Sequence, residues 1–456
     1  MIVDISITPT DLIRSLERAF ELSGEKIAAL ADRWDPRRGT PVYTQGGLYA
    51  TRGWTEWTQG FQHGSALLQY EATGDGRFLE LGRRGTREEM ATHVSHVGVH
   101  DHGFNNVSTY GNLRRLILSG KAPDEGDLSM CELALKVSGA IQAARWTNTQ
   151  SGGFVYSFNG PHSLFVDTIR SMRVLGIAHM LGHRLMSEGD RPISLFDRLV
   201  AHASTTAHYN VYYGEGRDAY DVPGRVAHEA IFNTIDGSFR CPSTQQGYSP
   251  FSTWTRGLAW AILGFSELLE FVDALPRSSF YTEGARAATL GVMQRAARVT
   301  SDYYIASTPT DGIPYWDTGA PGLANLGDYL ARPADPFNDH EPVDSSAAAI
   351  AAQGLLRLGR CLTRWAQPDG ERYWQAGLTL ARSLLDGPYL ATDPAHEGLL
   401  LHVVYHRPNG WDHIPPGRRV PCGESALWGD YHLRELMLVL LRECRGEPWL
   451  TFFGTA

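Results

Sequence analysis

The chain has 456 residues, of which 43% are hydrophobic and 20% are charged, so it can bury a large core. These values exclude a disordered tail and a small protein that depends on disulfide cross-links for its stability. The 41 basic and 50 acidic residues give a formal net charge of -9, which offers no electrostatic basis for binding nucleic acid or an anionic membrane surface.

The five cysteines lie far apart without CxxC spacing, and an odd number cannot form a complete disulfide framework. The first ten residues include Asp4 and lack the basic and then apolar order of a secretory signal. No apolar run reaches the length of about 18 residues that spans a bilayer. We therefore expect a cytoplasmic protein, a monomer or dimer, that binds neither nucleic acid nor a membrane.

Apolar residues recur at helical spacing along most of the chain, beginning at 12–22 and ending at 433–441. One pattern recurs along the chain, in which a polar or aromatic residue is followed by a helix with many small residues. It occurs in the segments 57–71, 167–181, 254–268, 344–358 and 429–440. A sixth such start lies at 100–104. Further helical stretches, such as 196–213 and 373–385, fall in the intervals and indicate one helix pair per unit.

Six inner helices, each alternating with an outer one, predict an all-α fold, an (α/α)6 barrel whose polar helix starts converge on one pocket. We expect residues 1–456 to form a single catalytic domain, with residues 1–40 as an N-terminal helical extension packed on it. The alternative is two or three ordinary helical domains, although no linker-like stretch separates them.

The segment 224–265 combines the side chains that a sugar site needs, namely His228, Gln246, Trp254, Arg256 and Trp260. Aromatic faces stack on sugar rings, amides and imidazoles bind hydroxyl groups, and an arginine can pair with a carboxylate. The two tryptophans stand six residues apart, about 120° short of two full helical turns, so one of them is expected to project from the loop. Equally, the tryptophans could fill the core while the arginine caps a loop.

Two aspartates at helix starts are candidates for acid/base work on a glycosidic bond. Asp101 lies inside a His-Asp-His tripeptide, but adjacent positions rarely point three ligands at one metal ion. Asp167 opens an apolar helix, where a helix cap is the common structural role. For Asp317 and Asp344 we favour structural roles. The motifs GxSxG, Walker A and GxGxxG are absent, which leaves serine-hydrolase and nucleotide functions without support.

Taken in order, these segments resemble the unsaturated glucuronyl hydrolases of glycoside hydrolase family 88. The resemblance covers about residues 57–431 and rests on WTQGF at 57–61, HDHGF at 100–104, Asp167, QGY at 246–248, STWTRGLAW at 252–260, PYWD at 314–317, DSSAAAIAA at 344–352 and GDY at 429–431. It implies an (α/α)6 barrel that releases a 4,5-unsaturated uronic acid from the non-reducing end of oligosaccharides left by a polysaccharide lyase.

The resemblance also implies roles for individual residues. Asp167 is similar to the general acid/base and Asp101 to the second essential aspartate; the residues expected to bind the substrate are Trp57, Phe158, His228, Gln246, Trp254, Arg256 and Trp260. Asp167 would donate a proton to C4, water would add at C5, and the hemiketal would open. We expect burial and Asp101 to raise the pKa of Asp167, and Arg256 to hold the substrate carboxylate. No metal or cofactor is needed for this chemistry.

Departures from the family pattern leave the leaving sugar open: Leu258 stands where the family usually has glutamine, and Phe158 where a tryptophan is expected. One alternative is an unsaturated rhamnogalacturonyl hydrolase, which shares the barrel and the chemistry. Another is a sugar isomerase like N-acylglucosamine 2-epimerase, which uses histidines such as His202, His208 and His228. A catalytically silent sugar-binding barrel is the third.

Overall fold

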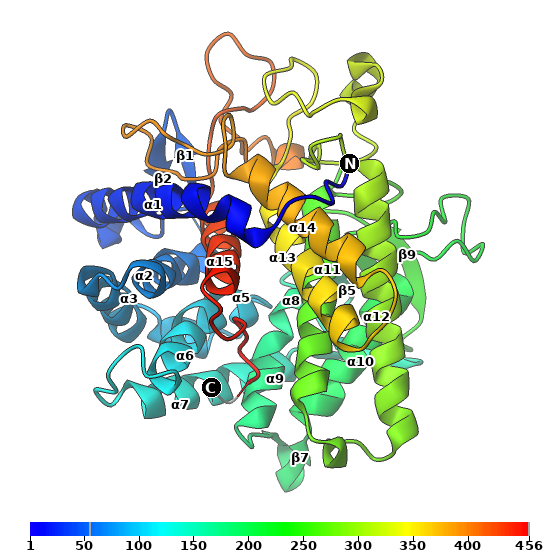
Figure 1. Ribbon diagram of the computed structural model, residues 1–456. Coiled ribbons are helices and arrows are strands. Elements are labelled where there is room, and N and C mark those ends of the chain that lie inside the picture. Colours follow the sequence, from blue (N-terminus) through cyan, green and yellow to red (C-terminus); the bar gives the residue numbers. More distant parts are fainter. Residues whose placement is uncertain (54–55, 455–456) are drawn as a thin grey trace.

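The computed structural model describes residues 1–53 and 56–454, and helices dominate it (Figure 1). The helices are α1 (Ile13–Arg33), α2 (Gln59–Thr73), α3 (Gly76–Glu88), α4 (Ala91–Val94), α5 (His102–Asn106), α6 (Asn112–Leu118), α7 (Asp127–Ala144), α8 (Thr168–Ser171), α9 (Arg173–Met180), α10 (Leu195–Tyr209), α11 (Thr255–Ala274), α12 (Glu283–Ser307), α13 (Ser345–Arg364), α14 (Gly370–Leu384) and α15 (Leu427–Cys444). A π-helical turn, η4 (Val107–Gly111), joins α5 to α6 into one helical rod.

Six helical rods form a closed inner ring within the described part of the chain. In ring order they are α2, the α5–η4–α6 rod, the α8–α9 rod, α11, α13 and α15. Each packs on the next, and α15 packs on α2, so the ring closes. Five of the rods begin within two residues after a helix start that the sequence predicts, whereas α15 begins at Leu427, two residues before the predicted start at 429.

The outer layer alternates with this ring along the chain. α3 packs on α2, α7 on α6, α10 on α9, α12 on α11 and α14 on α13 (Figure 1). α1 packs on both α2 and α15 and so provides the sixth outer helix of the described structure. The predicted (α/α)6 barrel is confirmed. The assignment of residues 1–456 to one domain, with 1–40 as an extension, stays a prediction.

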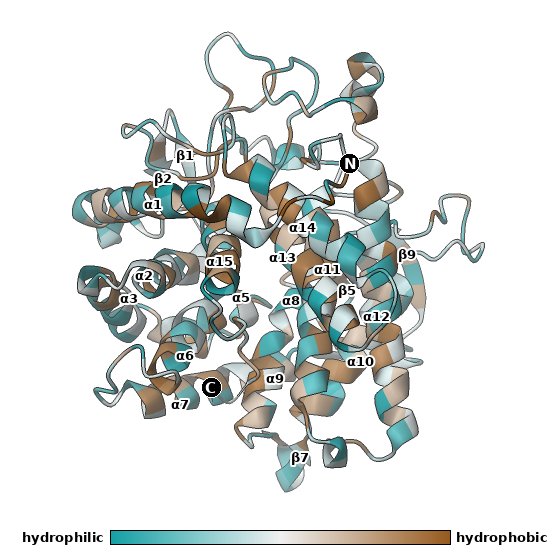
Figure 2. Ribbon diagram, in the orientation of Figure 1, coloured by the Kyte–Doolittle hydropathy of each residue, from teal (hydrophilic) through white to brown (hydrophobic). Residues whose placement is uncertain are grey.

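The helices show the two-sided character expected of this arrangement. Figure 2 shows hydrophobic and hydrophilic residues on different sides of the outer helices. Inner helices are buried almost all round: in α13 every residue from Ser345 to Gly359 is buried. Small residues permit the close packing, as at Gly60, where an added Cβ would lie 2.4 Å from the carbonyl oxygen of Asn105 on the neighbouring rod.

Strands are short and form no closed sheet among the described residues. They are β1 (Tyr43–Gln45), β2 (Leu48–Ala50), β3 (Trp146–Thr149), β4 (Gly152–Val155), β5 (Ser163–Phe165), β6 (Leu185–Ser187), β7 (Arg191–Ile193), β8 (Glu229–Phe232) and β9 (Phe239–Ser243). β5, β8 and β9 form one antiparallel sheet, in which Phe165 pairs with Glu229 and Glu229 with Ser243. The other strands pair as hairpins. In the described structure, no helix combines the length and apolar character required to cross a bilayer.

Candidate active site

One pocket gathers the predicted site residues from distant parts of the chain. Its lining residues are Trp57, His100, Asp101, Phe104, Phe158, Asp167, Gln245, Gln246, Trp254, Arg256, Trp260, Tyr405, His406 and Trp411. All the residues that the sequence singles out for the site are among them except His228, which is buried and whose ring contacts that of the pocket residue Trp254. They come from the starts of inner helices and from the loops that lead into them.

Asp101 and Asp167 hold equivalent positions in two neighbouring rods. Each immediately precedes a helix, α5 or α8, and each residue is largely buried, with relative exposures of 9% and 8%. In the described structure, neither carboxylate accepts a capping hydrogen bond from its own helix. The capping role that the sequence left open for Asp167 is therefore not what keeps its side chain in place.

Asp344 and Asp317 behave differently, as structural aspartates should. Asp344 caps α13 by accepting from the backbone N–H of Ser346 at 3.1 Å. Asp317 accepts from the backbone N–H groups of Tyr248 and Gly319, each at 2.8 Å, and burial raises its pKa to about 6. Neither lines the pocket. Their carboxylates are used to hold loops in place.

His100 lies between the two pocket aspartates. Its Nε2 atom is 3.8 Å from Oδ1 of Asp101 and also 3.8 Å from Oδ1 of Asp167, and the residue is only 1% exposed. Among the described residues, neither ring nitrogen has a hydrogen-bond partner within normal bonding distance. The imidazole therefore interacts with both carboxylates through charge, and a small movement would make a hydrogen bond to either.

The aromatic floor keeps this imidazole in position. The ring of Phe158 stacks on His100 with centroids 5.8 Å apart and an interplanar angle of 26°. The rings of His100 and Phe165, the last residue of β5, form a T-shaped pair with centroids 5.5 Å apart. These rings pack against the imidazole of the His100–Asp101–Asp167 group, which we call the proton-sharing triad.

Protonation in the proton-sharing triad differs from the sequence-based expectation. Burial raises the pKa of Asp101, aided by the charge of Asp167 and opposed by His100. Burial also works to raise the pKa of Asp167, but His100 outweighs it and leaves that pKa below the usual value. The expected raised pKa of Asp167 is therefore wrong. Burial opposes a charge on His100, yet the two carboxylates raise its pKa overall.

The three-stranded sheet sets the position of Asp167 and His228. β5 leads directly into Asp167, and the backbone N–H of Val166 donates to the carbonyl of His228 at 2.9 Å. Nδ1 of His228 accepts from the backbone N–H groups of Gln245 and Gln246, at 3.0 and 3.4 Å. The neutral imidazole therefore carries its proton on Nε2. Burial lowers the pKa of His228, which favours this neutral form.

Arg256 joins two parts of the pocket wall. Nη1 donates to Oδ2 of Asp344 at 2.6 Å and to the carbonyl of Val404, and Nη2 donates to the carbonyl of Tyr405 at 2.8 Å and to Oε1 of Gln246 at 3.3 Å. Its contact with Gln246 is the longest of these. The guanidinium thus holds the 404–405 segment in place, and its expected contact with the substrate carboxylate stays a prediction.

Aromatic rings form the rest of the wall. Trp57 stacks on Trp428, with centroids 5.2 Å apart, and meets Phe104 edge-on. Trp254 lies in extended backbone just before α11, whereas Trp260 lies within that helix. The two indoles therefore approach the pocket from different directions, as their six-residue spacing predicts. Such walls offer flat apolar faces to a sugar ring.

The sequence did not reveal the pocket residues His100, Phe104, Gln245, Tyr405, His406 and Trp411 as site residues. The last three belong to a loop without a motif. Asp412 anchors that loop, because its carboxylate accepts from the backbone N–H groups of Tyr405 and His406. For His100, its place inside HDHGF was a usable signal, because the motif puts it next to Asp101.

The remaining histidines do not converge on the pocket. His102 turns its ring to the side chain of Ser138 and the carbonyl of His96, each at 2.8 Å, so the His-Asp-His tripeptide does not present three ligands together. His202 is buried and accepts from the backbone N–H of Val155, while His208 is exposed. Neither His202 nor His208 lines the pocket, although the isomerase alternative needs such histidines there.

Comparisons with known proteins agree with one another. No family model matches the chain. The chain is 27% identical over 394 residues to an unsaturated glucuronyl hydrolase of Bacillus sp. strain GL1, covering 86% of this chain and 88% of the relative. It is 23% identical to an unsaturated chondroitin disaccharide hydrolase of Streptococcus agalactiae, covering 93% and 90%.

Solved structures share the fold. The crystal structure of the unsaturated glucuronyl hydrolase from Bacillus sp. GL1 matches with a TM-score of 0.69 at 23% identity, over 95% of this chain and 96% of that one. An unsaturated glucuronyl hydrolase specific for heparin matches with a TM-score of 0.71 at 20% identity, over 95% and 98%. Over most of its length the chain thus resembles the unsaturated glucuronyl hydrolases, which are glycosidases, as its motifs predict.

Proposed function

We propose that this protein releases the 4,5-unsaturated uronic acid from the non-reducing end of short oligosaccharides by acid-catalysed hydration of the C4=C5 double bond. The observation that carries the proposal is the proton-sharing triad: two buried carboxylates, one on each side of an imidazole, at the floor of an aromatic pocket. The relatives named above are hydrolases of unsaturated glucuronyl and chondroitin saccharides, which supports this class of substrate.

The triad can hold a proton and supply it through the carboxyl group of Asp167. The raised pKa values of His100 and Asp101 keep protons in the site, while Asp167 is the more acidic carboxyl group. The entering substrate brings its own carboxylate, whose negative charge raises the pKa of acids around it. We infer that a proton then passes from Nε2 of His100 to Oδ1 of Asp167, two atoms that lie 3.8 Å apart.

Proton transfer to C4 then starts the reaction. The π electrons of C4=C5 take the proton of Asp167, and the ring oxygen stabilises the cation that forms at C5. Water adds at C5 and returns a proton to the Asp167 carboxylate, so the net change is addition of one water. The C5 hemiketal opens, and the hemiacetal left at C1 releases the remaining sugar. Asp101, which lies 3.8 Å from His100, helps to retain the proton of the triad.

The pocket wall holds the uronate in the orientation that this step needs. Trp254 and Trp260 provide apolar faces, and Gln246 offers an amide for a hydroxyl group. Nη2 of Arg256 reaches Gln246 at 3.3 Å, so the same guanidinium can turn part of its donor capacity to a substrate carboxylate.

The test follows the ultraviolet absorbance of the conjugated C4=C5 uronate when the purified protein meets unsaturated disaccharides made by glycosaminoglycan, gellan and pectin lyases. Loss of absorbance on at least one disaccharide is expected, and the disaccharide that reacts names the leaving sugar. A preference for the rhamnose-containing pectin disaccharide would identify a rhamnogalacturonyl hydrolase. Persistent absorbance across the panel, with protein shown to be folded, contradicts the proposal.

A further inference from the structure

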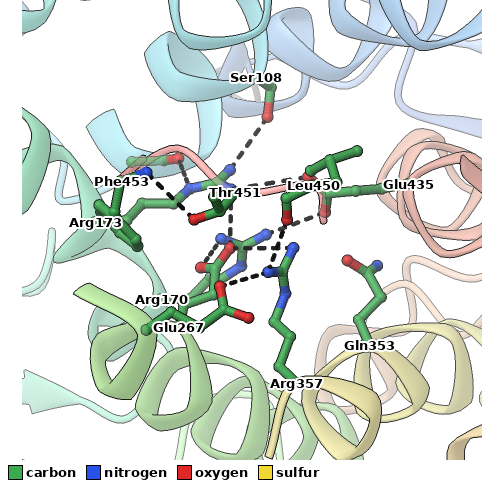
Figure 3. Close-up of polar contacts among 12 residues, drawn as sticks. Ser108, Arg170, Arg173, Glu267, Gln353, Arg357, Glu435, Leu450, Thr451 and Phe453 are labelled. Carbon is green, nitrogen blue, oxygen red and sulfur yellow. Dashed lines mark hydrogen bonds and ion pairs between the residues drawn. The ribbon is translucent and has the colours of Figure 1, made fainter. Parts of the chain in front are cut away.

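A second cluster of buried charges lies one helical turn beyond Asp167, inside the inner ring. It contains Arg170, Arg173, Arg357, Glu267 and Glu435, and we call it the arginine–glutamate cluster (Figure 3). Its members come from α8, α9, α11, α13 and α15, and all are at most 1% exposed. No step of the proposed reaction uses them.

Arg173 connects this cluster to the segment that carries Asp101. Its Nε donates to the carbonyl of Gly103 at 2.7 Å, two residues after Asp101, and its Nη2 donates to Ser108 at 3.4 Å. Its Nη1 lies 3.7 Å from Glu267 and 3.9 Å from Glu435, which balance its charge. One guanidinium thus spans the distance between α9 and the α5–η4–α6 rod (Figure 3).

The same two rods touch directly at Gly103. Its backbone N–H donates to Oγ of Ser171 at 2.9 Å, and Ser171 is four residues after Asp167. An added Cβ on Gly103 would lie 2.3 Å from the carbonyl oxygen of Ser171 and 2.4 Å from its Cα. The backbones after Asp101 and Asp167 therefore pack against each other with no side chain between them.

Arg170 fixes the other side of this contact. It donates to Glu267 on α11 and, at 3.1 Å, to Glu435 on α15. Because α8 has only four residues, it makes few helical hydrogen bonds of its own, so these ion pairs hold the short helix that follows Asp167.

We propose that Arg173, acting with Ser171 through Gly103, is a positioning residue that sets the separation of Asp101 and Asp167 on either side of His100. The inference rests on the proposed function, and it deepens the account of that same site. Buried ion pairs are expensive to desolvate and hydrophobic replacements are often as stable, so stability alone does not explain a guanidinium here. Arg173 instead has a role in catalysis if it keeps Asp101 and Asp167 each 3.8 Å from Nε2 of His100.

Arg357 offers a matched control in the same cluster. It is equally buried, but it donates to Glu270 at 2.6 Å and to the carbonyl of Leu450 at 3.1 Å, and it contacts neither rod that carries a pocket aspartate by hydrogen bonding in the described structure. Arg173→Met and Arg357→Met remove the same group from the same environment. Both variants are expected to lower the thermal unfolding temperature.

Only Arg173→Met should affect the chemical step. A misplacement of about 1 Å in a catalytic group can reduce turnover by about 100-fold, so kcat should fall by roughly that factor while KM changes little. The pH profile of kcat should also shift, because the groups facing His100 are Asp101, Asp167, Arg145, His202 and His228, and the first two would move. Arg173→Lys, which keeps a donor and the charge, should recover part of kcat.

Equal losses of kcat in the two methionine variants, or an unchanged pH profile in Arg173→Met, would overturn the inference. Should Arg173→Met not fold, Ser171→Ala removes only the hydroxyl that accepts from Gly103. It is expected to lower kcat by several-fold and to shift the same pH profile, and a parental profile would count against the proposal.

Carbon-13 NMR titration of the carboxyl groups separates this inference from the proposed function. A parent protein without turnover on every unsaturated disaccharide would contradict the proposed function. The spacing proposal would then still be tested, because the titration curves of Asp101 and Asp167 should differ between the parent and Arg173→Met and agree between the parent and Arg357→Met. Identical curves in all three proteins would overturn it.

Discussion

Two buried charge clusters lie a single helical turn apart along α8, and they are built in opposite ways. In the arginine–glutamate cluster each charge has an opposite partner, and Arg170 and Arg173 more than offset burial, so the pKa of Glu435 is lowered to about 2. In the proton-sharing triad the pKa of Asp101 and the pKa of His100 are both raised. Charges in the first cluster stay fixed near neutral pH, whereas protons in the second can move.

The difference teaches how burial can serve two purposes. A buried carboxylate bound to arginine is a permanent anion and holds helices together. A buried carboxylate that lies 3.8 Å from an imidazole, without a hydrogen bond to it, can either accept a proton from the ring or remain charged. The following changes, ordered from the largest expected effect to the smallest, test this contrast.

Asp167→Asn should have the largest effect, because it removes the proposed proton donor to C4. A general acid typically contributes between about 100-fold and 10,000-fold, and kcat should fall by a factor in that range. Loss of absorbance of the unsaturated uronate gives the rate. Asp317→Asn is the matched control, since that buried aspartate holds a loop and does not line the pocket. A folded Asp167→Asn protein with parental turnover would refute the role of Asp167.

His100→Gln should reduce kcat less but change the pH dependence more. The raised pKa of His100 means that the parent triad keeps its proton to higher pH than carboxyl groups alone would. Without the imidazole the proton rests on carboxyl groups, whose pKa values start near 3.9, so the alkaline limb of the profile should move to lower pH by at least about one unit. An alkaline limb that stays in place would show that His100 does not share the proton.

Arg256→Lys tests whether the pocket wall requires a guanidinium, which can donate to several acceptors at once. Lysine cannot reproduce the donations to Asp344 and to the two backbone carbonyls of the 404–405 segment. We expect KM to rise by about 10-fold to 100-fold, the equivalent of one hydrogen bond to a charged group, with a smaller effect on kcat. A change in kcat alone would place Arg256 in the chemical step instead.

Phe158→Leu should have the smallest effect. It keeps an apolar side chain but removes the ring that stacks on His100 with centroids 5.8 Å apart. Ring contacts of this kind correspond to about 3-fold to 10-fold in an equilibrium, so KM should rise within that range. Thermal unfolding of the variant serves as the control for folding. An effect as large as that of Asp167→Asn would mean that the ring does more than support the imidazole.

Sequence patterns predicted the ring of inner helices because small residues and polar helix starts recur once in each helix pair. They also predicted that Asp101, Asp167 and the residues around Trp254 belong to one site, which the pocket brings together. The resemblance to unsaturated glucuronyl hydrolases, stated from motifs in order, is confirmed by the relatives. The individual roles of these residues stay predictions.

Other features could not be read from the chain. The loop with Tyr405 and Trp411 is tied to the pocket by the donation from Arg256, which is 149 residues earlier in the chain, and such a long-range contact leaves no local pattern. The pKa of Asp167 depends on the position of Nε2 of His100, which lies 3.8 Å from its carboxylate. Tertiary packing, including the stacking of Phe158 on the imidazole, sets that position. The donation from Arg173 to the carbonyl of Gly103, 70 residues earlier, likewise has no signature in the local sequence.

The most direct test of the central claim is to carry out the reaction in heavy water on the disaccharide that reacts and to follow the uronate by NMR. Hydration predicts that the vinylic C4–H signal disappears as the sugar is released and that the product carries solvent deuterium at C4. Release of a uronic acid whose C4=C5 double bond is intact would contradict the account, because the glycosidic bond would then have been broken by direct displacement.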